Sequence, residues 1–261
     1  MRPGAPFRVA VFDFDDTLSL LRSGWQKVMI SQALEILEPL CSEESREGLY
    51  QFISQYVDDL TGKPTIHQME RLSEEAVQRG GKFIDPELHK QAYIQRLGLI
   101  RDQRVGAIRN GDAPRSQMIV GGAVSLLRSL SEQQIELILC SGTDDDAVKS
   151  EMDLLDLTRF FEPHIYGAPA TDPSFSKGRV FDEVIAKLKI NGSEIVAFGD
   201  GVVEIRETRR VDGYAIGVAK WSADQPEEFD RHRRRLIDAG AQAIIPDYEA
   251  LSDILQLLGL N

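Results

Sequence analysis

Acidic residues gather directly after a short apolar run near the start of the chain. Asp13 and Asp15 follow residues 7–12, which read Phe-Arg-Val-Ala-Val-Phe. The two aspartates are two positions apart, so a strand that continues through them places both on one face. One carboxylate can attack phosphorus as a nucleophile, and a second can protonate a leaving group and then activate water. The pair therefore predicts chemistry through an aspartyl-phosphate.

Further polar residues stand beside later apolar runs. Ser141 and Gly142 follow residues 135–140, Lys177 precedes a helical stretch, and Asp200 follows residues 194–198. Carboxylates brought together at one site repel one another unless a cation lies between them, and oxygen ligands favour Mg²⁺. Ser141 and the backbone N–H groups of a helix start can bind an anion. The fixed positive charge of Lys177 can stabilise phosphoryl oxygens.

The elements that must position these residues alternate along most of the chain. β-branched and aromatic runs predict strands at 7–13, 135–140, 163–167, 194–198, 213–218 and 243–245. Apolar spacing predicts helices between and after them at 123–132, 144–155, 178–189, 203–210, 226–239 and 249–258. This alternation predicts an α/β fold with a doubly wound parallel sheet. Ligand sites in such sheets lie at the carboxyl ends of the strands.

A helical stretch interrupts the alternation after the first strand. Apolar residues at intervals of three and four predict helices at 25–37, 43–60, 65–79 and 86–104. Ser42 and Asp85 are the expected helix starts. We therefore expect a Rossmann-like core and an inserted all-helical domain, with these ranges: core 1–17 and 116–261, insertion 18–115. Because the insertion leaves the carboxyl end of a strand, it should cover the site as a lid.

Composition argues against several functional classes. The 261 residues include 30 basic and 42 acidic ones, a net charge of −12, whereas non-specific nucleic-acid binding needs a basic surface. No apolar run reaches the ~18 residues of a membrane span, and no signal peptide precedes the first strand. The two cysteines fit neither a disulfide framework nor a zinc site. We expect a soluble cytoplasmic protein without nucleic-acid or membrane partners; the sequence does not indicate its oligomeric state.

The ordered motifs resemble those of the haloacid dehalogenase-like (HAD) superfamily. Residues 12–18, Phe-Asp-Phe-Asp-Asp-Thr-Leu, match its first motif, residues 141–143 the second, Lys177 the third and residues 199–204 the fourth. The resemblance implies that Asp13 is the nucleophile and Asp15 the acid and base. It also implies that Mg²⁺ is held by the Asp13 carboxylate, the Asp15 main-chain carbonyl and Asp200. The last acid of the fourth motif is usually Asp; here it is Glu204, which leaves open whether this residue touches the metal or only water bound to it.

The resemblance further implies a C1 helical cap and a relationship to the phosphoglycolate phosphatase and β-phosphoglucomutase type. The function we expect is Mg²⁺-dependent hydrolysis of a small phosphomonoester, a sugar phosphate or a phosphoglycolate-like compound. Two alternatives stay open: a phosphomutase of the same family, and a non-catalytic module that binds a phosphorylated metabolite. A dehalogenase needs no acid at position 15, because halide leaves unprotonated, so Asp15 favours phosphoryl transfer.

The cap must supply substrate specificity, because the core contacts only the phosphoryl group. Residues 61–65, Thr-Gly-Lys-Pro-Thr, open a cap helix, and in similar proteins a loop at this position reaches the substrate. We therefore expect Lys63, Thr65 and Gln68 to contact it, with Arg22 as a further contact. A purely structural helix start with Thr65 as N-cap is an equal alternative. The basic run 231–235, Arg-His-Arg-Arg-Arg, is expected to be a solvated helix face.

Overall fold

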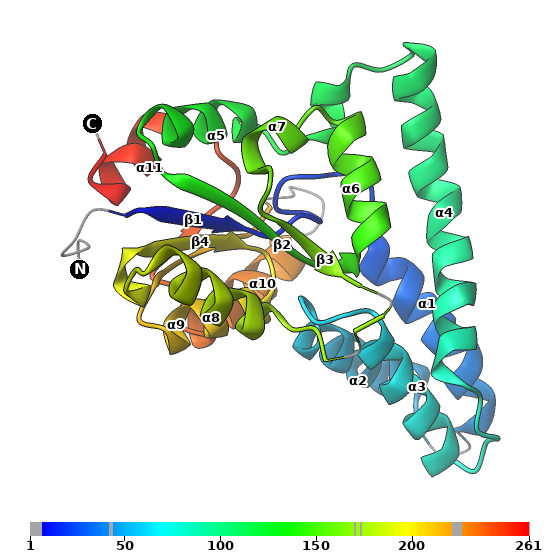
Figure 1. Ribbon diagram of the computed structural model, residues 1–261. Coiled ribbons are helices and arrows are strands. Elements are labelled where there is room, and N and C mark those ends of the chain that lie inside the picture. Colours follow the sequence, from blue (N-terminus) through cyan, green and yellow to red (C-terminus); the bar gives the residue numbers. More distant parts are fainter. Residues whose placement is uncertain (1–6, 42–43, 170, 173, 221–225, 261) are drawn as a thin grey trace.

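A six-stranded sheet forms the centre of the fold (Figure 1). The structure is a computed structural model and describes residues 7–260 apart from 42–43, 170, 173 and 221–225. All neighbouring strands are parallel, in the order β3-β2-β1-β4-β5-β6. The strands are β1 (Val9–Phe12), β2 (Glu136–Asp144), β3 (Ile165–Ala168), β4 (Ile195–Gly199), β5 (Tyr214–Val218) and β6 (Ala243–Ile245). The predicted doubly wound α/β fold is confirmed.

Helices cover both faces of this sheet (Figure 1). Residues alternate between the faces, so Phe12 packs with one set of helices and Val11 with the other. Phe12 also stacks on Phe198 of β4, with ring centroids 4.6 Å apart. The first face carries α5 (Ala123–Glu132), α6 (Asp145–Leu154), α7 (Thr158–Phe161) and α11 (Leu251–Leu258). The second carries α8 (Lys177–Leu188), α9 (Val202–Arg210) and α10 (Pro226–Asp238).

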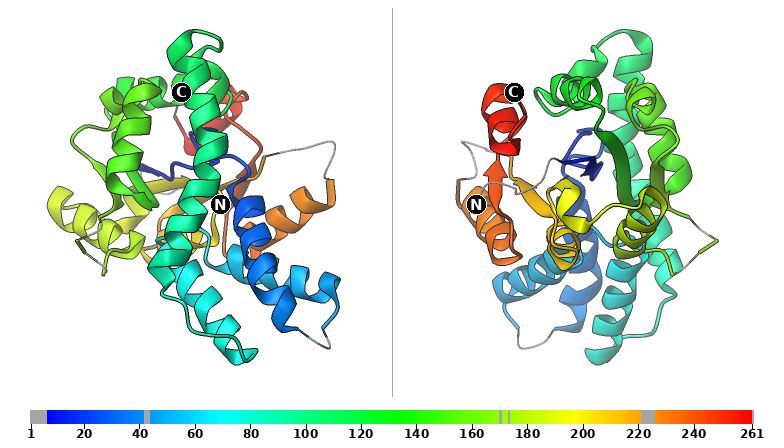
Figure 2. Two further views of the ribbon diagram at one scale, coloured as in Figure 1. Left: turned by 90° about the vertical axis from the view of Figure 1, so that its right-hand side faces the viewer. Right: turned by 60° about the vertical axis from the view of Figure 1, so that its left-hand side comes forward.

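The inserted helices lie together beyond the carboxyl ends of the strands, with their own apolar core (Figures 1 and 2). They are α1 (Trp25–Leu37), α2 (Arg46–Asp59), α3 (Ile66–Gln78) and α4 (Pro86–Asn110). Short 3₁₀ turns complete the elements at Glu38–Leu40, Arg115–Met118 and Gly192–Glu194. The fold therefore consists of a Rossmann-like core and a helical cap; the boundaries 17/18 and 115/116 between them stay a prediction.

The two connections between core and cap run beside each other. The Leu20 N–H donates to the Met118 carbonyl, and the Val120 N–H donates to the Leu18 carbonyl, both at 2.9 Å. Arg104 of α4 donates to the carbonyl groups of the outgoing connection at 2.9–3.0 Å. These bonds tie the long helix of the cap to the point where the chain leaves the core.

Cap helices α2 and α4 differ from the sequence prediction at one end each. Helix α4 runs to Asn110, past the predicted end at residue 104, because Gly106 interrupts the apolar pattern without ending the helix. The helix ends at the C-cap Gly111, which adopts the left-handed conformation with φ of 78°. Helix α2 begins after Ser45, whose hydroxyl accepts the Gly48 N–H; the predicted start at residues 42–43 lies outside the described residues.

The second strand is also longer than predicted. After an irregularity in register, Asp144 pairs with Ala168 of β3, which extends β2 beyond residue 140. Helix α6 therefore begins at Asp145 rather than directly after residues 141–143. No helix in the described part of the chain combines the length and apolar character that crossing a membrane requires.

Candidate active site

Asp13 and Asp200 lie at the carboxyl ends of the adjacent strands β1 and β4. Strand order reverses between these strands, which is where open α/β sheets bind ligands. The Asp13 N–H donates to the Phe198 carbonyl at 3.0 Å, and the Asp200 N–H donates to the Thr17 hydroxyl at 3.1 Å. Both carboxyl groups are buried. Burial and the nearby charge of Asp13 raise the pKa of Asp200 well above its ordinary value.

Asp15, two residues beyond Asp13, is half-buried. Its Oδ2 accepts a hydrogen bond from the Thr143 hydroxyl at 2.6 Å, and its Oδ1 lies 3.8 Å from Nε of Arg22. Oδ1 has no hydrogen-bond partner among the described residues. Burial raises the pKa of Asp15 to about 7, and the charge of Arg22 opposes this rise. A carboxyl group with such a pKa can both give and take a proton near neutral pH.

A buried lysine joins two carboxylates beneath the site. Lys177 is the first residue of α8, after the N-cap Ser176, whose side chain accepts the Arg179 N–H. Its Nζ lies 2.5 Å from Oδ1 of Asp13 and also bonds Oε1 of Glu204, in the first turn of α9. The other oxygen of Glu204 is buried and has no partner in the described structure. Glu204 thus directly contacts Lys177.

Ser141 and Gly142 lie in the last part of β2, where its pairing with β3 is irregular. The Ser141 hydroxyl oxygen accepts the Thr143 N–H at 3.1 Å, so the side chain stabilises this irregular part of the strand. A Cβ atom on Gly142 would lie 2.6 Å from the carbonyl oxygen of Lys63 in the cap. Only glycine allows the cap backbone to come this close to β2.

The cap loop at residues 61–65 lies directly on the core. Gly62 has φ of 93°, and a Cβ atom there would lie 2.4 Å from Oε1 of Glu204. A Cβ atom on Gly201 would lie 3.0 Å from the Thr61 carbonyl oxygen. The loop therefore lies against Glu204 and against the end of β2 at Gly142.

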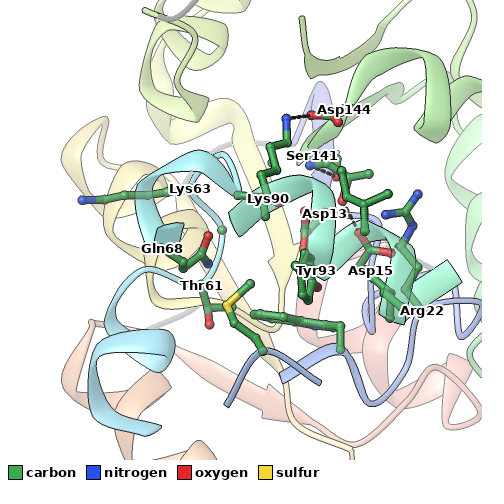
Figure 3. A pocket seen from close by; sticks show the side chains of 18 of the residues that line it. Asp13, Asp15, Arg22, Thr61, Lys63, Gln68, Lys90, Tyr93, Ser141 and Asp144 are labelled. Carbon is green, nitrogen blue, oxygen red and sulfur yellow. Dashed lines mark hydrogen bonds and ion pairs between the residues drawn. The ribbon is translucent and has the colours of Figure 1, made fainter. Parts of the chain in front are cut away.

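Between cap and core lies a cavity of about 60 Å³ (Figure 3). Asp13, Asp15, Asp200, Ser141 and Gly142 line it from the core. The four residues expected to contact the substrate also line this cavity: Arg22, Lys63, Thr65 and Gln68. The side chain of Lys63 nevertheless points away from Asp13 and Asp15 (Figure 3). Thr65 is the N-cap of α3, but its side chain makes no capping hydrogen bond.

Other cavity residues were not singled out from the sequence. Trp25, Met29, Lys90, Tyr93, Ile94 and Leu97 come from α1 and α4. Their apolar spacing is the ordinary signal of a helix that packs in a core, so the sequence does not distinguish the cavity wall from the cap core.

Two ion pairs across the domain boundary were also missed. Arg22 donates to Glu151 of α6 through Nη2 at 2.8 Å and through Nε at 3.0 Å. Lys90 of the cap donates to Asp144 at 2.7 Å. Neither Glu151 nor Asp144 has a motif or a spacing that marks it in the sequence.

The basic run of α10 corrects the prediction of a solvated face. Arg235 bonds the Asp58 carboxylate and main-chain carbonyl of cap helix α2, both at 2.6 Å. The ring Nε2 of His232 lies 2.6 Å from the carbonyl oxygen of Asp200. Arg233 and Arg234 remain exposed. Two residues of the run therefore face the cap and the site, because the amphipathic helix turns one side of the run inward.

Comparison with solved structures finds the same fold in several proteins of similar length. A phosphonoacetaldehyde hydrolase-like protein from Oleispira antarctica is 14% identical, with a TM-score of 0.64 over 99% of this chain and 94% of that one. A predicted phosphoglycolate phosphatase from Haemophilus somnus is 14% identical, with a TM-score of 0.61 over 97% and 100%. A β-phosphoglucomutase from Clostridium difficile is 12% identical, with a TM-score of 0.61 over 97% of both chains. At these identities the likeness concerns the fold.

Sequence comparison places the chain in a family. No curated protein matches it. A family model described as haloacid dehalogenase-like hydrolase matches residues 7–212, which include each of the four motifs. The chain therefore belongs to the haloacid dehalogenase-like hydrolases.

Proposed function

We propose that the protein is a Mg²⁺-dependent phosphatase that hydrolyses small phosphomonoesters through an aspartyl-phosphate on Asp13. The observation that carries this proposal is the shared cavity: the Asp13 carboxylate and the Asp15 carboxyl group both line it. Lys177 bonds the Asp13 carboxylate, and the Asp15 carboxyl group has a buried oxygen without a hydrogen-bond partner in the described structure. A binding module would have no need for a nucleophile beside a proton donor of pKa about 7.

In the proposed reaction, an oxygen of Asp13 attacks phosphorus while the bond from phosphorus to the leaving oxygen breaks. Asp15 gives its proton to that leaving oxygen. Lys177, together with Ser141 and Gly142, holds the phosphoryl oxygens. Water then attacks phosphorus, Asp15 takes the proton of the water, and the Asp13 carboxylate is released with phosphate. The cap loop on Glu204 keeps other water from the site.

The residues present fit a magnesium ion. Two buried carboxylates, Asp13 and Asp200, lie close enough that the charge of Asp13 raises the pKa of Asp200. A divalent cation between them would remove this repulsion. No three Asp, Glu, His or Cys side chains of the described residues meet as a metal cluster, and in our proposal the main-chain carbonyl of Asp15 completes the ligand set. When bound, Mg²⁺ supplies positive charge to the phosphoryl group. Because Glu204 bonds Lys177, we place it outside that set.

The cap and the substrate are proposed as follows. Residues 18–115 act as a C1 cap over a core of residues 1–17 and 116–261. A cavity of about 60 Å³ has room for roughly four to six water molecules, which suits a small phosphorylated metabolite. A cytoplasmic location remains a prediction.

Phosphate release from a panel of small esters tests the proposal, with Mg²⁺ and with EDTA. We expect release that needs Mg²⁺ and is lost in Asp13→Asn, and a phosphoenzyme that acid quenching traps only in the unmodified protein. Asp253→Asn, which makes the same change at an exposed position of α11, serves as the control. Steady turnover by Asp13→Asn would refute the covalent mechanism. Isomerisation primed by a bisphosphate, without net hydrolysis, would instead identify a mutase.

A further inference from the structure

We infer that the leaving group of the substrate is uncharged, carries a hydroxyl group and has a short apolar side, as in the phosphate ester of a small polyol. Carboxylate-bearing esters such as phosphoglycolate are then poor substrates. The inference rests on the proposed function and concerns only the part of the substrate beyond phosphorus. Three features of the cavity around that part support it: the pairing of its cations, its unsatisfied polar atoms and its apolar wall.

Two cations of the cavity wall, Arg22 and Lys90, are already paired with carboxylates. Nε and Nη2 of Arg22 bond Glu151, and Nε lies 3.8 Å from Oδ1 of Asp15. Lys90 pairs with Asp144 at 2.7 Å. Lys63, also on the wall, is exposed and points away from the aspartates (Figure 3). A leaving-group carboxylate beside Arg22 or Lys90 would thus lie next to the carboxylates that already pair with these cations, which is costly.

The polar atoms on the cap side of the cavity favour a hydroxyl group on the substrate. Gln68 is 3% exposed, and its Nε2 donates to the Leu60 carbonyl at 3.2 Å, which fixes the amide orientation. Its Oε1 is buried without a partner in the described structure, and the amide end points toward the rest of the cavity (Figure 3). A buried acceptor left unpaired is unfavourable, and a hydroxyl donor satisfies it. The Thr65 hydroxyl, which does not cap its helix, lies on the same rim.

The opposite wall is apolar and leaves little room. Trp25, Met29, Tyr93 and Leu97 line it from α1 and α4. Ring faces and thioethers of this kind pack against the C–H side of a small polyol or aldose, whose hydroxyl groups point the other way. The cavity of about 60 Å³ must also contain the phosphoryl group, so a small leaving group fits it best.

Three esters of equal chain length test the inference. Glycerol 3-phosphate carries hydroxyl groups, 3-phosphoglycerate adds a carboxylate, and propyl phosphate has neither. We expect kcat/KM for glycerol 3-phosphate to exceed that for 3-phosphoglycerate by at least about tenfold, and that for propyl phosphate by about tenfold, because one buried polar group is paired or left unpaired in each comparison. Acetyl phosphate, which is small and reactive, tests whether the protein hydrolyses a phosphate at all, independently of leaving-group recognition.

Variants separate charge pairing from simple fit. Glu151→Gln and Asp144→Asn each release one cation of the cavity, and we expect both to raise the ratio of 3-phosphoglycerate to glycerol 3-phosphate turnover about fivefold or more. Glu35→Gln makes the same kind of change at the exposed pair with Arg96, whose nitrogen lies 2.8 Å from Glu35, and should leave the ratio unchanged. Gln68→Met removes the acceptor and should lower the ratio of glycerol 3-phosphate to propyl phosphate turnover toward one.

The outcomes distinguish the two proposals. Asp13-dependent hydrolysis of acetyl phosphate together with equal or faster turnover of 3-phosphoglycerate would overturn this inference and leave the proposed function intact. Equal turnover of glycerol 3-phosphate and propyl phosphate would overturn it as well. Failure of the protein to hydrolyse any ester or acetyl phosphate would remove the proposed function and this inference with it.

Discussion

The contact of the cap loop with Glu204 can be tested by adding one carbon atom. In Gly62→Ala the new Cβ would lie 2.4 Å from Oε1 of Glu204. Real Cβ atoms stay at least 3.0 Å from such a neighbour, so loop and carboxylate must separate by about 0.6 Å. Glu204 cannot easily retreat, because its other oxygen faces Gly201 and its charge bonds buried Lys177. We therefore expect the loop, rather than the carboxylate, to move.

The magnitude of this effect has two parts. Alanine in the left-handed conformation costs about 1–2 kcal/mol, because its Cβ approaches the following carbonyl oxygen. This part lowers stability, with a fall in Tm of a few degrees for a chain of this size. The second part is the displaced loop: misplacement of about 1 Å at an active site costs up to about 100-fold in rate. For a shift of about 0.6 Å we expect kcat/KM to fall between about 10-fold and 100-fold.

Gly80→Ala is the matched control for the backbone strain. Gly80 also has positive φ, 81°, and lies in the cap, but nothing lies within 4 Å of its added Cβ. Both variants should lose similar Tm in thermal unfolding, whereas kcat/KM for a small ester should fall only in Gly62→Ala. If the two variants keep kcat/KM within twofold of each other, closure of this loop over Glu204 is not part of catalysis.

Three further results are expected. Because burial raises the pKa of Asp15 to about 7, kcat/KM for propyl phosphate should fall as pH rises above 7. Acetyl phosphate, whose leaving group needs no proton, should not show this fall. Identical pH profiles for the two esters would contradict the role of Asp15 as acid. Arg235→Met leaves half-buried Asp58 unpaired, at a cost of about 1–2 kcal/mol, and should raise KM several-fold by loosening the cap. Arg233→Met, at an exposed position of the same helix, should match the unmodified enzyme. Equal KM in both variants would show that the ion pair between Arg235 and Asp58 does not hold the cap in place. Burial raises the pKa of the Cys140 thiol to about 12, so a thiol reagent should label one cysteine per chain before unfolding and two after; rapid labelling of both would show that the β2 strand opens.

The convergence of the motif residues on one cavity could be predicted from the sequence, because these residues stand at strand ends. Asp13, Ser141 and Asp200 each follow a buried apolar run within one or two residues, and parallel strands bring their carboxyl ends to one edge. Lys177 begins a helix that returns to the same edge. The helix start expected at Ser42 lies outside the described residues, whereas the one expected at Asp85 is confirmed, because the Asp85 side chain accepts the Glu87 N–H.

What could not be predicted depends on contacts between distant segments. Arg22 and Glu151 are 129 residues apart, and Lys90 and Asp144 are 54 apart. Each partner is an ordinary charged helix or turn residue by sequence, and only the orientation of the cap over the core pairs them. The same holds for Arg235 and Asp58, which are 177 residues apart. The residues on the core side of the cavity can thus be predicted from motifs, whereas those on its cap side depend on tertiary packing.

The contact with the cap explains how a glutamate is accommodated at position 204. A longer side chain than the aspartate usual at this place in the family carries its carboxylate further from α9, to Lys177 on one side and to the cap loop on the other. That reach is compatible with a closed loop only if position 62 has no Cβ, and Gly62, with its positive φ, meets this condition. Gly201 similarly leaves space for the second oxygen. Glu204 therefore links Lys177, which bonds Asp13, to the cap loop at Gly62, so the position of the cap and the charge around Asp13 depend on the same side chain.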